Sequence, residues 1–217
     1  MSFVVRPGGT LDRAEQRRAD LIATAAQLIT DRGYHDTTVS DITNALGASH
    51  GTFYNYFRNR REILDAVLDQ RFSEIQAHVL GKDEKQADTL DEFVAAAVGI
   101  AGRLQTSMVN DPGLIRFLAY EAPAIDQELI DKIDGWLNGI VQLTSRQIAH
   151  GVDAGYLRSE IDSEMAGWSV TALIFAAAAG GLAGPGDVPG DAFIAALADL
   201  LRHGLGATPT QEQSQQA

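Results

Sequence analysis

Cysteine is absent from the 217 residues, which excludes disulfides and thiolate metal sites. The five histidines show no ligand spacing and no nucleotide-binding loop follows a strand, so we expect no metal and no cofactor. Residues 1–12 lack the apolar segment of a secretory signal. These absences favour a cytoplasmic protein that does no metal or redox chemistry.

Acidic residues are missing from one segment of an otherwise acidic chain. The net charge is −12, yet residues 1–71 carry nine arginines against nine acids, and residues 44–61 carry no acid at all. Approach to nucleic acid depends on the local field and not on the total charge. This segment could therefore face DNA, although a chance gap in a solvated surface would look the same. Its basic or titratable members are His50, Arg58, Arg60 and Arg61.

Apolar residues recur at steps of three and four along nearly the whole chain, and no convincing strand pattern occurs. The sequence therefore predicts an all-α protein of about nine helices. Glycines, prolines and capping residues divide the pattern. The expected helices are 13–32, 39–46, 50–56, 60–81, 89–110, 112–121, 126–154, 162–184 and 190–204.

Two short helices near residue 47 have the layout of a helix-turn-helix. Thr38 and Asp41 form a capping-box pattern, Gly47 ends the first helix, and Ser49 can cap the second. A glycine-containing turn of this length places the second helix in the major groove, with its N-terminal residues toward the bases. Phe53 can then face the core.

Residues 37–64 read TTVSDITNALGASHGTFYNYFRNRREIL, which resembles the signature of the TetR family of transcriptional regulators. The preceding helix with Gly33-Tyr34 is similar as well, and residues 155–158 match a run found in many members. His50 replaces a frequent lysine, Tyr56 a frequent histidine and Leu46 a common alanine. These departures affect the expected operator sequence and not the class.

The resemblance implies an N-terminal three-helix DNA-binding domain at 13–58 and a C-terminal ligand-binding and dimerisation domain at 59–205. A flexible arm at 1–12 and a disordered tail at 206–217 would flank them. It further implies a homodimeric repressor that binds a palindromic double-stranded DNA operator and is released by an unidentified small-molecule inducer. Dimerisation would use helices 162–184 and 190–204. The expected DNA contacts are Thr38, Ser40, Ser49, His50, Gly51, Thr52, Tyr54, Asn55, Tyr56, Arg58 and Arg60.

Aromatic and sulfur-containing side chains in the second half suggest where an inducer could bind. Pockets between helices are lined by such residues with a few polar groups, although most aromatics in helical proteins simply fill the core. The hypothesis is a cavity for a hydrophobic molecule, because this half has few basic residues to hold a phosphate. The expected lining is Phe93, Met108, Phe117, Tyr120 and Trp136.

Three alternatives remain open. The same fold could serve an activator or a regulator without a ligand. Residues 47–51 match G-x-S-x-G, which would make Ser49 a hydrolase nucleophile, but the spacing before it is helical where that motif needs a strand. Residues 165–186 carry no charge and could anchor a membrane protein, but glycine-rich composition and acidic flanks favour a buried subunit interface without membrane contact.

Overall fold

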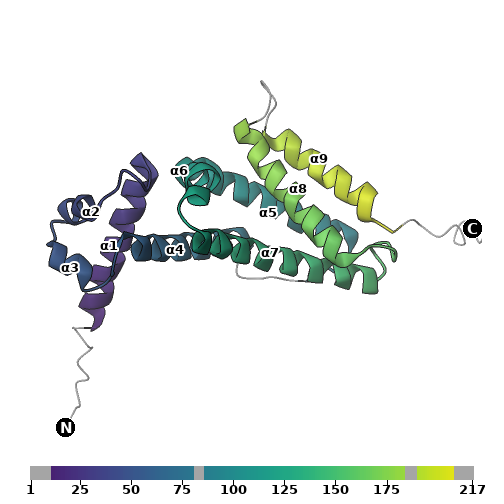
Figure 1. Cartoon of the computed structure of the whole chain (residues 1–217). Helices are drawn as coiled ribbons and strands as arrows, with labels where there is room; N and C mark the ends of the chain where they lie inside the picture. The colour runs from purple at the N-terminus through teal and green to yellow at the C-terminus, as the bar shows by residue number, and fades with distance from the viewer. Residues whose placement is uncertain (1–10, 81–85, 184–189, 208–217) are drawn as a thin grey trace, which may run out of the picture. The chain divides into compact units, whose positions relative to one another are not determined.

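The computed structural model describes residues 11–80, 86–183 and 190–207, and within these ranges it consists of helices joined by turns and loops, with no named strand (Figure 1). This confirms the all-α class. The predicted arm and tail fall almost entirely on residues 1–10 and 208–217, outside the described residues. The described helices are α1 (Leu11–Arg32), α2 (Val39–Leu46), α3 (His50–Tyr54), α4 (Arg60–Leu80), α5 (Leu90–Asn110), α6 (Pro112–Arg116), α7 (Gln127–Asp153), α8 (Ser163–Ala183) and α9 (Gly190–Leu205).

The predicted helix at 112–121 is the one that departs most from regular α geometry. α6 is followed by a π-helical turn, η1 (Phe117–Glu121), and a 3₁₀ turn, η2 (Ala122–Ala124). Pro123 lies in the 3₁₀ turn, where its missing N–H removes a backbone donor that a regular α-helix would use. The sequence showed where this helix must end but not that its last turn would widen.

The chain divides into two compact units. The first combines the residues up to Ser73 with Asp111–Leu129, and the second combines Glu74–Asn110 with the residues from Ile130 onward. The division differs from the boundary expected at 58/59. The reason is that Ile63 and Val67 of α4 complete the core beneath the first three helices.

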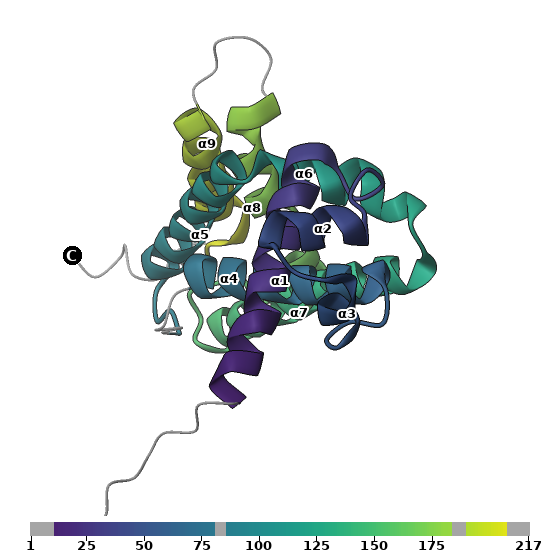
Figure 2. The ribbon, with the colours of Figure 1, turned by 90° about the vertical axis from the view of Figure 1, so that its left-hand side faces the viewer.

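The first unit is built on a small apolar core. α2 packs on α1 and α3 on α2, and Figure 2 shows α2 and α3 side by side next to α1. Phe53 and Phe57 are fully buried, with ring centroids 5.8 Å apart. Burial of each such side chain contributes about 1.5–3 kcal/mol. The core consists of Leu21, Ile22, Ala25, Ala26, Ile42, Phe53, Phe57, Ile63 and Val67.

The second unit consists mainly of long helices, in which α5, α8 and α9 pack against one another (Figure 1). α8 is apolar over nearly its whole length, and only its first turn carries an acid. A helix that is apolar on all sides requires partners on more than one face. Of the helices in the described ranges, none is both long and apolar enough to cross a membrane.

The close approach of α6 to α1 predicts opposite effects for two glycine substitutions. A Cβ at Gly113 would meet the Thr30 side chain and lie 2.7 Å from the Thr30 carbonyl oxygen, whereas a Cβ at the exposed Gly139 of α7 meets nothing within 4 Å. We expect Gly113→Ala to lower the free energy of unfolding by about 1–3 kcal/mol. Gly139→Ala should raise it by about 0.5–1 kcal/mol through helix propensity. Urea unfolding followed by circular dichroism measures both, and a neutral or stabilising Gly113→Ala would contradict the packing.

Candidate nucleic-acid interface

α2, α3 and the turn between them are fixed by three local interactions. Thr38 caps α2 by accepting the N–H of Asp41, whose carboxylate in turn accepts the N–H of Thr38. Gly47 ends α2 in the left-handed region with φ +64°, which glycine adopts without strain. Ser49 caps α3 by accepting the N–H of Thr52 at 3.1 Å. The segment is thus a helix-turn-helix, as predicted.

The capping box also tunes the carboxyl group of Asp41. Hydrogen bonds from the Thr38 hydroxyl and backbone N–H, together with the nearby Arg32 guanidinium, lower the pKa of Asp41. A lowered folded-state pKa stabilises the fold above the unfolded pKa, and this stabilisation is lost as the pH falls through the folded value. The start of α2 is therefore most stable at neutral pH, where the carboxylate is ionised.

Most of the predicted DNA-contacting residues lie on the outer surface of this motif. Phe53 turns inward from α3, and this leaves the opposite face of the helix to solvent. Tyr54 is 57% exposed although it is a large aromatic residue. The exposed members are Thr38, Ser40, Ser49, His50, Gly51, Tyr54, Asn55 and Arg58, and the half-buried ones are Thr52, Tyr56 and Arg60.

A side-chain hydrogen bond joins the two helices on this outer face. The Ser40 hydroxyl of α2 lies 3.2 Å from Nε2 of His50, the first residue of α3. The pair leaves Nδ1 of His50 as the ring nitrogen not used in this contact. Sequence reasoning placed both residues at the interface but did not foresee that one would orient the other, since they are ten residues apart.

The three arginines at the start of α4 have different surroundings. Arg58 is 85% exposed at its side chain and pairs with Glu62, whose pKa is lowered by the Arg58 backbone N–H and guanidinium. Arg60 donates from Nη1 to the carbonyl oxygens of Tyr34, His35 and Thr37 at 2.8–3.1 Å. Its guanidinium also stacks 4.2 Å from the centre of the Tyr34 ring. Arg60 thus anchors the α1–α2 loop, which weighs against its being chiefly a phosphate ligand.

Arg61 points to the segment that follows α6. Its guanidinium donates to Asp126 through Nε at 2.7 Å and Nη2 at 3.2 Å. These bonds raise the pKa of Arg61 and lower that of Asp126. In the same segment Glu121 accepts the backbone N–H of Tyr34 at 2.8 Å. Sequence reasoning missed these partners, because nothing in the spacing links residues 60–90 positions apart.

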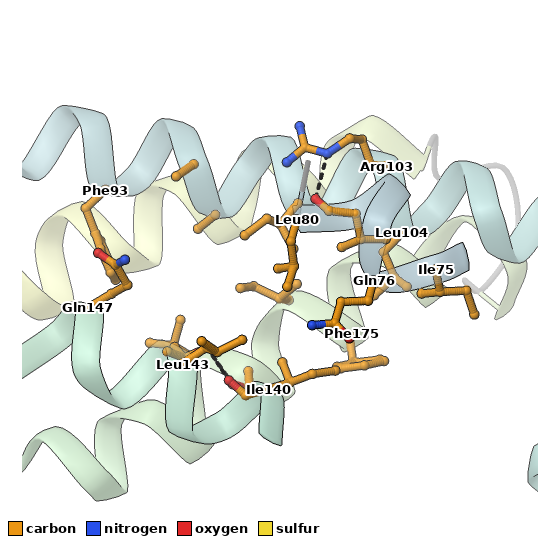
Figure 3. Close-up of a pocket in the computed structure, with 18 of the residues that line it drawn as sticks. Ile75, Gln76, Leu80, Phe93, Arg103, Leu104, Ile140, Leu143, Gln147 and Phe175 are labelled. Atoms are coloured by element: carbon orange, nitrogen blue, oxygen red, sulfur yellow. Dashed lines mark hydrogen bonds between the residues drawn. The ribbon is translucent and has the colours of Figure 1, made fainter. Parts of the chain in front are cut away.

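The second unit contains a cavity of about 230 Å³ between α4, α5, α7 and α8 (Figure 3). Of the predicted lining residues, Phe93 and Trp136 border it. Met108, Phe117 and Tyr120 do not. Phe117 is buried in the first unit, Met108 is core, and Tyr120 is 79% exposed to solvent.

The lining residues that the sequence analysis did not predict recur at helical spacing, and this spacing is visible in the sequence. On α5 the lining recurs at 93, 96, 97, 100, 103 and 104, and on α7 at 136, 140, 143, 144 and 147. Steps of three and four mark one face of each helix. Selecting aromatics alone overlooked the aliphatic majority: Ile75, Val79, Leu80, Ala87, Ala96, Ala97, Ile100, Leu104, Ile140, Leu143, Val170 and Ile174.

Comparison with known proteins agrees with this geometry. Residues 21–67 match the sequence model of "Bacterial regulatory proteins, tetR family". The chain is 25% identical over 146 residues to the fatty acid metabolism regulator protein of Bacillus subtilis, covering 67% of this chain and 73% of that protein. It is 25% identical over 162 residues to the regulator BetI of Escherichia coli, covering 73% and 78%.

A solved regulator from Saccharomonospora viridis, in complex with choline, superposes with a TM-score of 0.72 at 21% identity, covering 89% of this chain and all of that one. Fold and site together define a helix-turn-helix transcription regulator and not an enzyme. Residues 21–67 thus carry the DNA-binding region of the tetR family of bacterial regulators, and the whole chain shares the fold of such a regulator. Ser49 caps a helix that follows another helix, so it lacks the strand-to-helix turn of a hydrolase nucleophile.

The unequal surroundings of Arg58 and Arg60 predict unequal effects on stability. Arg60→Met removes three hydrogen bonds and the contact with the Tyr34 ring, and should lower the free energy of unfolding by about 1–3 kcal/mol. Arg58→Met removes an exposed ion pair and should change it by no more than about 0.5 kcal/mol. Urea unfolding distinguishes them. Equal losses in both variants would mean that Arg60 is not an anchor.

Proposed function

We propose that this protein is a cytoplasmic homodimeric repressor that binds a palindromic operator and is released by a small hydrophobic molecule. The observation that carries the proposal is the outer face of α2 and α3, where exposed polar side chains surround a short recognition helix and residues 44–61 contain no acid. Two such helices related by a twofold axis would fit half-sites about one helical turn apart.

The roles on DNA follow from exposure and chemistry. His50, Thr52 and Asn55 would face base edges, since they stand on or directly after α3 and carry donors and acceptors. Tyr54, Tyr56 and Arg58 would hold phosphates, with Thr38 and Ser40 contributing from the start of α2. Gly51 would allow close approach of the DNA backbone. Arg60 would act mainly by keeping the α1–α2 loop in place.

Exposed apolar rows on the last two helices support a dimer. α8 leaves Met165, Trp168 and Leu173 between 38% and 57% exposed, and α9 leaves Leu200 56% exposed. A contiguous apolar surface of this kind is typical of a subunit interface. The row on α8 consists of Met165, Trp168, Ala172, Leu173 and Ala176, and that on α9 of Ala192, Ala196 and Leu200.

Chain continuity suggests how a ligand could act on DNA binding. The cavity lining comes partly from α5 and α7, and Asp111–Leu129, which joins these helices and includes the start of α7, belongs to the DNA-binding unit. In that segment, Glu121 accepts the backbone N–H of Tyr34, and Asp126 accepts a hydrogen bond from the Arg61 guanidinium. A ligand that favours one arrangement of α5 and α7 would thus bias this segment, and affinity for DNA would change by an equal coupling free energy.

Operator binding is tested by fluorescence anisotropy on the intergenic DNA beside the gene, at two salt concentrations, against a scrambled duplex. We expect tight, salt-sensitive binding that prefers the native sequence. Arg58→Gln should weaken binding to all sequences and reduce the slope of log K against log salt by about one for each half-site. Asn55→Ala should instead alter sequence preference.

The matched control for operator binding is Arg146→Gln, an exposed arginine on α7. It should leave affinity and slope unchanged. No binding by the wild type at low salt, or an Arg58 variant with an unchanged slope, would contradict the assigned interface.

Dimerisation is tested by substituting arginine for apolar residues in the exposed rows of α8 and α9. Trp168→Arg and Leu200→Arg should convert the dimer to a monomer at micromolar concentration and weaken operator binding at least tenfold, because a buried unpaired charge is costly (about 3–5 kcal/mol). Tyr120→Arg replaces an even more exposed aromatic outside these rows and should stay dimeric. Sedimentation velocity measures the mass of each variant in solution and so distinguishes dimer from monomer. A dimer that survives both substitutions would move the interface elsewhere.

A further inference from the structure

The chemistry of the cavity wall restricts the ligand more closely than its size does. The lining is apolar apart from Gln76, Arg103, Thr144, Gln147 and Thr171. Thr171 donates to the Thr144 hydroxyl at 3.1 Å, and Thr144 donates to the Ile140 carbonyl, so these hydroxyl protons are already used. The two glutamine amides make no hydrogen bond to another described residue and can meet a ligand.

No aspartate or glutamate lines the cavity in the described part of the chain. A permanent cation entering it would lose its hydration and gain only the faces of Phe93, Trp136 and Phe175 in return. A ligand with several negative charges fits no better, because Arg103 is the single cation of that lining. The wall therefore suits a molecule with at most one negative charge.

Arg103 is placed to receive that charge. It is half-buried on α5, and its Nε donates to the Val79 carbonyl in the last turn of α4 at 2.8 Å. Figure 3 shows this bond at the edge of the cavity beside Leu80. The Nη nitrogens pair with no carboxylate among the described residues. A guanidinium has five donors and its planar fork matches a carboxylate, so one used donor leaves the fork available.

We propose that the effector is a small apolar monocarboxylic acid, bound with its tail among the aliphatic residues and its carboxylate on Arg103 at the cavity edge. Figure 3 shows Gln147 beside Phe93, at the end of the cavity away from Arg103, so we assign the carboxylate to Arg103 alone. The assignment deepens the proposed function, on which it relies for the release from DNA. The binding itself does not depend on that function.

The test uses one tail with three head groups. Isothermal titration calorimetry of the full chain without DNA compares octanoate, 1-octanol and octyltrimethylammonium. Octanoate should bind at least about tenfold more tightly than octanol, since it alone gains charge-assisted hydrogen bonds. Octyltrimethylammonium should bind more weakly than octanol. From hexanoate to octanoate the affinity should rise by about fourfold for each added methylene, until the cavity is full.

Variants at Arg103 separate head-group binding from folding. In Arg103→Met, octanoate should fall to the affinity of octanol while octanol binding is unchanged, which a merely unfolded variant could not show. Arg103→Lys keeps the charge without the fork and should retain part of the preference. Arg146→Met, on the exposed side of α7, should behave as wild type.

Several results would overturn the assignment: octanol or octyltrimethylammonium binding as tightly as octanoate, no probe binding, or an Arg103→Met variant that still prefers octanoate. Addition of octanoate to the operator complex separates the two proposals. Octanoate binding to the protein without lowering operator affinity would support the ligand class and contradict ligand-induced release. Operator binding without any octanoate binding would overturn the ligand class and leave the regulator assignment intact.

Discussion

The corner between α1 and α2 holds the DNA-binding unit together. The chain turns at Gly33, where φ is +91°, and a Cβ there would lie 2.9 Å from the Glu121 carboxylate. Glu121 accepts the N–H of Tyr34, and the Arg60 guanidinium donates hydrogen bonds to the carbonyl oxygens of residues 34, 35 and 37. Groups that a loop would otherwise leave to water are thus bound by side chains from two distant segments. Because α2 begins directly after this corner, the position of the helix-turn-helix on α1 depends on it.

The two units are stabilised in different ways. α2 and α3 have eight and five residues, too few for stable isolated helices, and they rely on the caps at Thr38 and Ser49 and on burial of Phe53. The second unit has helices of 16 to 27 residues whose apolar faces are wide enough to pack on one another and still leave a cavity. A small unit fixed by polar caps presents a defined surface, whereas a larger apolar unit can change its packing around a ligand.

Sequence reasoning succeeded where the determining contacts are local. The capping box at Thr38, the left-handed Gly47 and the cap at Ser49 are each decided within four residues, and they locate the helix-turn-helix without tertiary information. The cavity could not be found in this way. Phe117 and Trp136 are both aromatic residues on helices, yet Phe117 packs into the first unit and Trp136 borders the cavity. The reason is that α6 and the turns after it belong to the first unit, although α5 before them and most of α7 after them belong to the second. Which neighbour a helix meets is a property of the topology and not of its own pattern.

The arginines at the start of α4 show why counting charges overstates the positive field at the DNA surface. Arg58, Arg60 and Arg61 are close in sequence, but Arg61 is neutralised by Asp126, Arg60 is turned into the α1–α2 loop, and Arg58 alone is extended to solvent with Glu62 beside it. At the proposed interface, phosphate attraction would then come as much from neutral donors, namely the hydroxyls of Ser40, Tyr54 and Tyr56, as from cations. Neutral donors gain nothing from counterion release, so an interface of this composition should depend less steeply on salt than one built on lysines. In an acidic protein, such an interface favours directional hydrogen bonds to DNA phosphates. Non-directional charge attraction, which any polyanion would satisfy, contributes less.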